Sequence, residues 1–202
     1  MKKKFIATAM ISTLLCIGVS FANDARAVTG ITFGGQVGVG AFIGPNTIFG
    51  SAAGMKNGGL VLRGSVGYNH ALNKRWSVGV ETGISNGFDL IKMGPIGISD
   101  FSVPLLATLS YTLPSGWNFF TKAGIGFHKY TLSAGGQSES GGKIHIAPEI
   151  AMGVGYQIGK LNIYGQYTQT IAKFLGAGNG NLGSSAIATS SITAGVTYTL
   201  PM

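Results

Sequence analysis

WNFFTKAGIGFH, residues 117–128, is the stretch that decides the predicted fold. Successive side chains of a β-strand point to opposite faces of a sheet, so a two-residue alternation indicates a strand. One face of this stretch is mainly apolar and consists of Trp117, Phe119, Thr121, Ala123, Ile125 and Phe127. The opposite face consists of Asn118, Phe120, Lys122, Gly124, Gly126 and His128. The stretch is therefore predicted to be a strand with two unlike surfaces.

Seven other stretches show the same alternation, at about 33–42, 60–69, 76–85, 101–111, 144–156, 161–170 and 191–200. Short turns are expected near 71–75, 114–116 and 157–160, and longer loops at about 44–57, 86–99, 131–143 and 171–187. Short turns at one end and long loops at the other are typical of outer-membrane barrels. The predicted fold class is all-β, an eight-stranded antiparallel up-and-down transmembrane β-barrel.

Two prolines, Pro104 and Pro148, fall inside predicted strands. Proline has no backbone N–H and removes one hydrogen bond from the ladder. A local bulge or an earlier strand end is therefore expected at each of them.

The composition excludes the main alternatives to a barrel. Charged residues make up 10% of the chain, yet no second long apolar run follows the amino-terminal segment, which excludes a helical membrane protein. Hydrophobic residues make up 45%, and aromatic residues recur throughout, which excludes a disordered low-complexity chain.

Residues 1–27 are predicted to be a secretory signal peptide. They begin with three lysines, continue with an apolar run over 5–19, and end in small-residue patterns that predict cleavage after Ala22 or Ala27. The remainder, 28–202, is predicted to form one barrel domain in the bacterial outer membrane. Cleavage removes the only cysteine and leaves ten basic and five acidic residues. These charges are scattered singly, so anionic lipid headgroups are expected as counter-charges, and nucleic acid is not.

The charged residues inside the predicted strands all lie on the polar face: Arg63, Glu81, Lys122 and Glu149. The interior of an eight-stranded barrel is just wide enough for side chains to fill it, and buried charges there need partners. We therefore expect a lumen charge network that joins Arg63 to Glu81 across one hairpin and Lys122 to Glu149 across another. The alternative is that water in the lumen hydrates each charge separately.

Aromatic residues lie at the strand ends of the apolar face. Five of them are expected to form a girdle at the lipid interface: Trp76, Tyr111, Trp117, Tyr156 and Tyr198. The alternative is that they are ordinary packing residues.

The closing segment 193–200 combines a polar residue, a glycine and spaced aromatic or apolar residues. With the signal peptide and the eight strands, it resembles the outer-membrane protein A-like and opacity-protein family of small barrels. The resemblance implies an assembly signal, recognised by the barrel-assembly machinery, at Thr193, Gly195, Tyr198 and Leu200. The chain departs from the family in ending with Met202 where an aromatic residue is usual, and no peptidoglycan-binding domain is expected after the barrel.

Catalytic and metal-binding motifs are weak. Residues 83–87 fit G-x-S-x-G and residues 178–183 fit G-x-G-x-x-G, but neither has the strand-to-helix context that its chemistry requires. Compared with barrel hydrolases of lipid A, the chain has Gly83 where a histidine base is needed to activate Ser85. His128 and His145 are expected to lie opposite each other as hydrated lumen residues. No catalytic residue, cofactor or metal is expected.

The expected function is structural and interactive: a monomeric barrel that supports the envelope and adheres through its outer loops to a host or surface ligand. The expected lipid partners include lipopolysaccharide, whose phosphates could contact Lys56, Lys92, Lys129, Lys143 and Lys173. Solvated lysines are the alternative. Two other functions stay open, a small low-conductance pore or apolar-solute channel and, less favoured, a lipid A-modifying enzyme.

Overall fold

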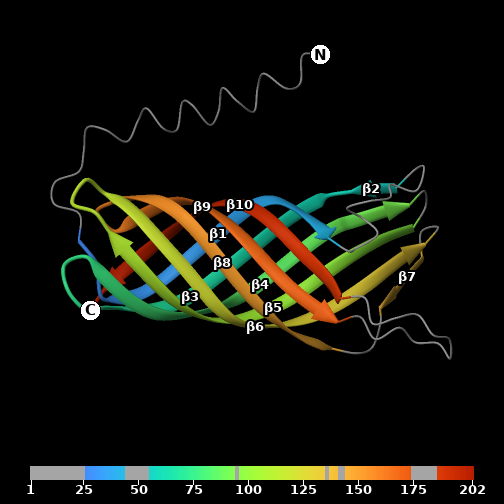
Figure 1. The fold of residues 1–202 in the computed structure, drawn as a ribbon, viewed down its shortest axis with the longest axis horizontal. Helices are drawn as coiled ribbons and strands as arrows, with labels where there is room; N and C mark the ends of the chain where they lie inside the picture. Colours follow the sequence, from blue (N-terminus) through green and yellow to red (C-terminus); the bar gives the residue numbers. More distant parts are fainter. Residues whose placement is uncertain (1–25, 44–54, 94–95, 135–136, 141–143, 174–185) are drawn as a thin grey trace, which may run out of the picture.

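Eight long strands form a closed barrel in the computed structural model, which describes residues 26–43, 55–93, 96–134, 137–140, 144–173 and 186–202 (Figure 1). The long strands are β1 (Gly30–Ile43), β3 (Gly59–Ala71), β4 (Trp76–Met93), β5 (Ile96–Thr112), β6 (Trp117–Ala134), β8 (His145–Ile158), β9 (Leu161–Lys173) and β10 (Ala186–Pro201). Two short strands, β2 (Met55–Asn57) and β7 (Gln137–Ser140), pair with β4 and β6. Each long strand pairs antiparallel with the next, and β1 pairs with β10. The predicted fold class is confirmed.

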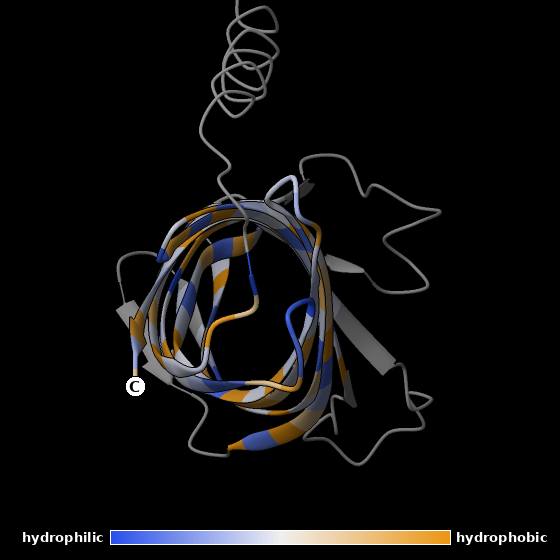
Figure 2. Cartoon of the chain, turned by 90° about the vertical axis from the view of Figure 1, so that its left-hand side faces the viewer, coloured by the Kyte–Doolittle hydropathy of each residue, from blue (hydrophilic) through white to orange (hydrophobic). Residues whose placement is uncertain are grey.

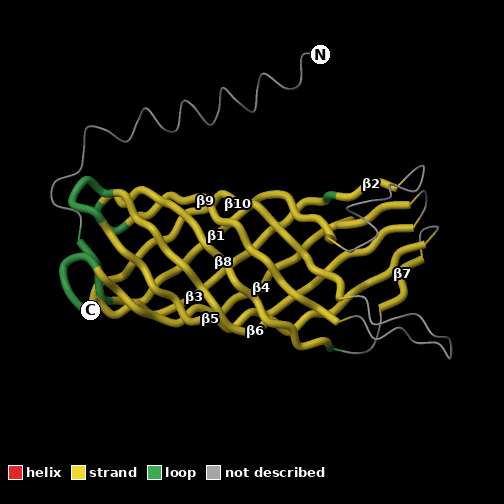
Figure 3. Tube along the Cα trace, in the orientation of Figure 1, coloured by secondary structure: helices red, strands yellow, loops and turns green. Residues whose placement is uncertain are grey.

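The alternation in the sequence becomes the two surfaces of the barrel wall. Figure 2 shows hydrophobic and hydrophilic residues alternating along the strands, and Figure 3 shows the strands crossing the long axis obliquely. Apolar side chains of the outer surface are exposed, whereas most polar ones on the opposite surface are buried in the lumen. No helix among the described residues is long and apolar enough to cross a membrane.

Short turns connect the strands at the end of the barrel where both described termini lie (Figure 1). In the β3–β4 turn, Asn73 Oδ1 accepts hydrogen bonds from the backbone N–H groups of Arg75 (2.8 Å) and Trp76 (2.9 Å). The other two turns contain Gly116 and Gly159, whose φ angles of 93° and 60° are easy only for glycine. We call this the turn end, and the opposite end the loop end.

Residues 26–29 cross the opening at the turn end (Figure 2). The N–H of Ala27 donates to the carbonyl of Lys74 at 3.0 Å, and Gln157 Nε2 donates to the carbonyl of Arg26 at 3.0 Å. These partners belong to turns on opposite sides of the barrel. The segment therefore partly covers the opening, and the predicted signal peptide upstream, residues 1–25, lies outside the described residues.

The strands extend further at the loop end than the sequence predicts. A loop was expected at 86–99, but β4 continues to Met93 and β5 begins at Ile96. The β4–β5 register shifts between Gly87 and Ile91, so the alternation of side chains changes phase inside the paired region. The change of phase made a continuous strand look like a loop. Strands β4, β5 and β6 form a wall that reaches furthest at this end (Figure 1).

The two prolines have different outcomes. At Pro104 the expected bulge or strand end is wrong, because β5 continues to Thr112 and keeps one register with β6. In this part of the β4–β5 ladder only the pairs at Val103 and Pro104 are missing, and the Pro104 carbonyl accepts a hydrogen bond from Thr82 Oγ1 at 2.8 Å. At Pro148 the expected early strand end is confirmed on the side of β8 that faces β9. Strand β8 pairs with β9 only from Glu149 to Ile158, while its pairing with β6 continues through Pro148 to His145.

Candidate functional site in the barrel lumen

Four charged side chains meet in the middle of the lumen, one from each of β3, β4, β6 and β8. Arg63 Nη1 lies 2.7 Å from Glu149 Oε1, and its Nη2 lies 3.6 Å from Glu81 Oε1. Lys122 Nζ donates to both oxygens of Glu81, at 3.0 and 2.8 Å. All four residues are buried, and Glu149 is only 2% exposed. Each charge therefore has an opposite charge close to it, which offsets the cost of burying it in the lumen.

The partners differ from those expected. The pairing of Lys122 with Glu149 is wrong, because Lys122 binds Glu81 while Glu149 binds Arg63. Arg63 and Glu81 do approach, but at 3.6 Å their contact is the longest of the three ion pairs. The physical reason is the narrow lumen: long side chains reach across it to strands that are not their neighbours.

Aromatic rings hold Lys122 from the turn-end side. Its Nζ lies 5.2 Å from the centre of the Phe120 ring and 5.7 Å from that of Tyr164, and the two rings meet edge to face at 5.3 Å. A ring face attracts a cation, most strongly where water is excluded. Phe120 and Tyr164 therefore stabilise the ammonium in addition to Glu81.

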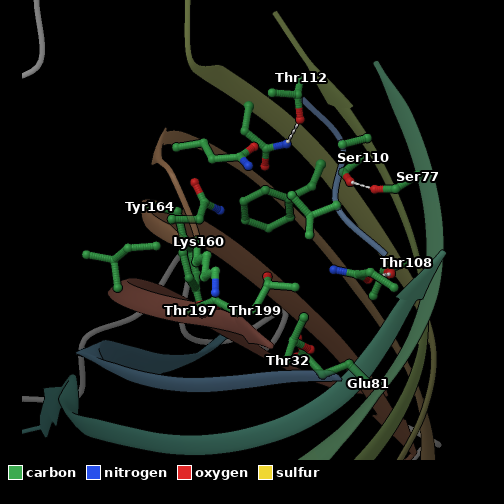
Figure 4. A pocket seen from close by; sticks show the side chains of 18 of the residues that line it. Thr32, Ser77, Glu81, Thr108, Ser110, Thr112, Lys160, Tyr164, Thr197 and Thr199 are labelled. Atoms are coloured by element: carbon green, nitrogen blue, oxygen red, sulfur yellow. Dashed lines mark hydrogen bonds between the residues drawn. The ribbon is translucent and has the colours of Figure 1, made fainter. Parts of the chain in front are cut away.

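The charge network separates two cavities. The cavity at the turn end has a volume of about 90 Å³ and is lined by Glu81, Lys122, Lys160 and many hydroxyl groups (Figure 4). The cavity on the loop side has a volume of about 40 Å³ and contains Arg63, Glu149 and His128 in its lining. The four charged residues thus lie between the two spaces.

A buried histidine and aspartate lie beside the smaller cavity. His128 Nδ1 is 2.9 Å from Asp100 Oδ2, and both residues are buried. His145 lies opposite His128 in the β6–β8 register, as expected, and Tyr130 stacks near both imidazoles. The sequence had not singled out Asp100. The described residues contain no group of three or more His, Cys, Asp or Glu that could hold a metal ion.

An apolar layer fills the lumen nearer the loop end. It consists of Val61, Leu90, Tyr130 and Ala147, with Ile98 packed against them. Leu90 is 1% exposed and follows Asp89, whose φ of 49° lies in the left-handed region. Here the register shift turns Leu90 into the lumen. We call these five residues the apolar layer. The position of Leu90 in it could not be predicted from the sequence, because the register shift interrupts the alternation.

The aromatic residues expected at the lipid interface lie on the outer surface at the turn end. Trp76 and Tyr111 are opposite each other on β4 and β5, with ring centres 4.8 Å apart. Trp117 and Tyr156 are opposite each other on β6 and β8, with ring centres 5.7 Å apart. Tyr198 is exposed on β10. This arrangement is compatible with the expected girdle.

The residues of the expected assembly signal divide between the two surfaces of β10. Thr193 faces the lumen, where its hydroxyl donates to Gln36 Oε1 at 2.9 Å. A Cβ at Gly195 would lie 2.8 Å from Gln36 Cγ and 3.0 Å from Tyr164 Cζ, so this glycine makes room for lumen side chains. Tyr198 and Leu200 face outward. Recognition by an assembly machinery stays a prediction.

The structure does not strengthen the remaining candidate motifs and loop lysines. Ser85 lies in the lining of the smaller cavity, within a β-strand rather than a strand-to-helix turn. Residues 178–183 lie outside the described part of the chain. Among the expected loop lysines, Lys92 is exposed and lies 3.5 Å from Asp89, and Lys129 is exposed on β6. Lys143 lies outside the described residues, and the side chains of Lys56 and Lys173 are not described.

No protein-family model and no curated protein sequence matches the chain. Solved structures do match. The crystal structure of Neisserial surface protein A is 14% identical, with a TM-score of 0.63 over 87% of this chain and 100% of the other. The attachment invasion locus protein of Yersinia pestis, in complex with the heparin analogue sucrose octasulfate, is 13% identical, with a TM-score of 0.51 over 85% and 99%. The expected resemblance is thus confirmed in its fold: this chain has the architecture of a small eight-stranded outer-membrane β-barrel.

Proposed function

We propose that this protein is exported by its signal peptide, resides in the bacterial outer membrane, and acts through its loop end as a structural and surface-interaction barrel without catalysis. The observation that carries the proposal is the double closure of the lumen. Ion pairs cross its middle, and the apolar layer closes it nearer the loop end. A lumen closed in this way does not favour the pore alternative.

The outer surface supports residence in a membrane. Large apolar side chains of all eight long strands face outward, including Val80, Leu105 and Ile192, each more than half exposed. In water this surface would be a costly apolar patch, whereas in a bilayer it meets lipid chains. The aromatic pairs at the turn end match the position of an interface girdle.

The loop end offers surface for interaction. The wall formed by β4, β5 and β6 reaches furthest there, and it carries the exposed cations Lys92 and Lys129. Lysines at this level suit the phosphates of lipopolysaccharide or an anionic host ligand. The Yersinia pestis protein of similar fold is in complex with a heparin analogue, which makes a sulfated sugar a suitable first probe.

The lumen does not support an enzyme. A serine nucleophile needs a base within hydrogen-bond reach, and His128 is the base nearest to a serine, Ser102, in the strand register. However, His128 Nε2 has no hydrogen-bond partner among the described groups, so no serine hydroxyl is positioned on it.

Single-channel recording in planar bilayers tests the proposal. The refolded protein should insert without steady conductance. A double variant that weakens both closures, Glu149→Ala with Leu90→Ala, should show open steps and thereby prove that insertion is detected. Steady open steps from the unmodified protein would overturn the proposal in favour of the pore.

Surface binding and export need their own measurements. Cells that display the barrel should retain sucrose octasulfate, and Lys92→Gln with Lys129→Gln should weaken retention, whereas Lys160→Gln at the turn end should not. The intact mass of the protein from outer-membrane fractions should show the loss of residues 1–22 or 1–27. A full-length mass would contradict the cleavage of a signal peptide. Unaltered binding by the Lys92 and Lys129 variant would contradict the role of the loop-end lysines.

A further inference from the structure

The β3–β4 turn at the turn end combines two cations with an aromatic pair. Lys74 and Arg75 are exposed on this turn, and Trp76 follows them at the start of β4. Arg75 Nη1 donates to Tyr111 Oη at 3.3 Å, and the Tyr111 ring lies 4.8 Å from that of Trp76. We call Lys74, Arg75, Trp76 and Tyr111 the basic corner. Its guanidinium is held beside the outward-facing rings rather than over the lumen.

The backbone of the turn keeps this arrangement in place. Asn73 Oδ1 accepts from the N–H groups of Arg75 and Trp76, and the N–H of Leu72 donates to the Trp76 carbonyl at 2.9 Å. The guanidinium has five N–H donors, of which the bond to Tyr111 uses one. Arginine is well suited to bind phosphate because its planar donors match phosphate oxygens. The basic corner therefore offers an anion a positioned donor group.

The same barrel contains a second aromatic pair, and the turn before its tryptophan carries no charge. Trp117 and Tyr156 form a similar pair at the turn end, but the turn beside them, residues 113–116, has the sequence Leu-Pro-Ser-Gly and no charge. Lys160, on the third turn, lines the inner cavity (Figure 4). Of the two pairs, only Trp76 with Tyr111 has cations on the turn that directly precedes its tryptophan.

The charge around the basic corner favours an anion. No acidic residue in the described part of the chain lies on a short turn: Glu81 and Glu149 are in the lumen, and Asp89, Asp100 and Glu139 belong to strands in the loop half. An anion at the basic corner therefore meets no carboxylate on the turn itself.

We propose that the basic corner binds the phosphate of an anionic glycerophospholipid, with its acyl chains against Trp76 and Tyr111. The lipid would belong to the leaflet at the turn end, which is the periplasmic leaflet in the expected orientation. This inference rests on the proposed membrane span. It assigns a lipid site on the side opposite to the loop-end lysines.

The two tryptophans of the chain allow a direct test. In Trp117→Phe the only tryptophan is Trp76 at the basic corner, and in Trp76→Phe it is Trp117 at the neutral turn. Each variant is refolded into bilayers of phosphatidylcholine with a minor fraction of phosphatidylglycerol, and either lipid carries bromine on its acyl chains as a fluorescence quencher. Brominated phosphatidylglycerol should quench Trp76 more than its mole fraction predicts, and should quench Trp117 in proportion to that fraction.

Charge and salt provide the controls. Changing Lys74 and Arg75 to Gln should reduce the enrichment at Trp76 by about fivefold per cation, whereas Lys129→Gln at the loop end should leave it unchanged. Salt at about 1 M, where the Debye length is about 3 Å, should abolish it in the protein with both cations. The salt measurement uses the protein with both cations, so it does not depend on whether the Lys74 and Arg75 variant folds.

The outcomes separate the inference from the proposed function. If brominated phosphatidylcholine quenches neither tryptophan, the barrel does not span the bilayer and both proposals fail. If brominated phosphatidylcholine quenches both tryptophans, the membrane span stands. The lipid site is then overturned if phosphatidylglycerol is not enriched at Trp76, or if its enrichment there does not change with salt. A lipid preference shared equally by both tryptophans would also overturn the site.

Discussion

The two halves of the lumen are closed in different ways. In the half toward the turn end, side chains keep a regular two-residue alternation, and the closure consists of ion pairs beside a cavity of about 90 Å³. In the half toward the loop end, the register shifts, and the closure is the apolar layer around Leu90. In this barrel, charged side chains fill the lumen where the alternation is regular, and hydrocarbon fills it where the β4–β5 register shifts.

The closures also differ in what a substitution should cost. An ion pair depends on both partners, because a lone buried charge is expensive. An apolar layer depends on volume, because a missing side chain leaves a cavity. Substitutions in the two closures should therefore differ in their effect on stability.

Glu149→Gln should lower the free energy of unfolding by about 3 kcal/mol, because it leaves the Arg63 guanidinium without its 2.7 Å partner. The measurement is the midpoint of urea unfolding in lipid vesicles. A variant with methionine at both Arg63 and Glu149 removes both charges and should recover most of the loss. An unchanged midpoint for Glu149→Gln would show that water, and not the network, satisfies Arg63.

Leu90→Ala should cost about 2–4 kcal/mol by the same assay, because this side chain is 1% exposed within the apolar layer. The matched control is Leu105→Ala, since Leu105 faces outward and is 53% exposed. The control should cost less, because lipid chains can fill the space that it leaves. Equal losses for the two leucines would mean that Leu90 does not act as packing inside the lumen.

Gly126→Ala should destabilise the barrel by about 1–3 kcal/mol, since an added Cβ would lie 2.5 Å from His128 Nε2 and 3.2 Å from Glu149 Oε2. Gly64→Ala is the control, because a Cβ there would meet nothing within 4 Å. Thermal or urea unfolding of the two variants should therefore differ. A neutral Gly126→Ala would indicate that His128 has room to move away.

Asp89→Gly should stabilise the loop half by about 0.5–1 kcal/mol, because glycine adopts the φ of 49° without the strain that a Cβ brings. Its exposed contact with Lys92 contributes little in water and should not offset this gain. Hydrogen exchange of the amides near the register shift provides the measurement. Faster exchange after the substitution would contradict the interpretation of Asp89 as a strained position.

Much of this protein could be predicted from its sequence because the physical signal is local. The alternation at 117–128 identifies a strand by itself, and eight such stretches predict the barrel and its two surfaces. The same alternation placed Arg63, Glu81, Lys122 and Glu149 on the lumen side before their partners were known. Trp76 and Trp117 could be placed on the outer surface for the same reason.

Which groups meet in the lumen depends on the closed barrel. Arg63 and Glu149 are 86 residues apart, and they pair because closing the barrel brings β3 and β8 within reach across a narrow lumen. Leu90 enters the lumen because a register shift of the paired β4 and β5 changes its direction, and no single strand records that shift. The strands and their faces could be read from the sequence alone, since the direction of each side chain follows from the local chain. The pairings and the apolar layer depend on register and on distances across the closed barrel.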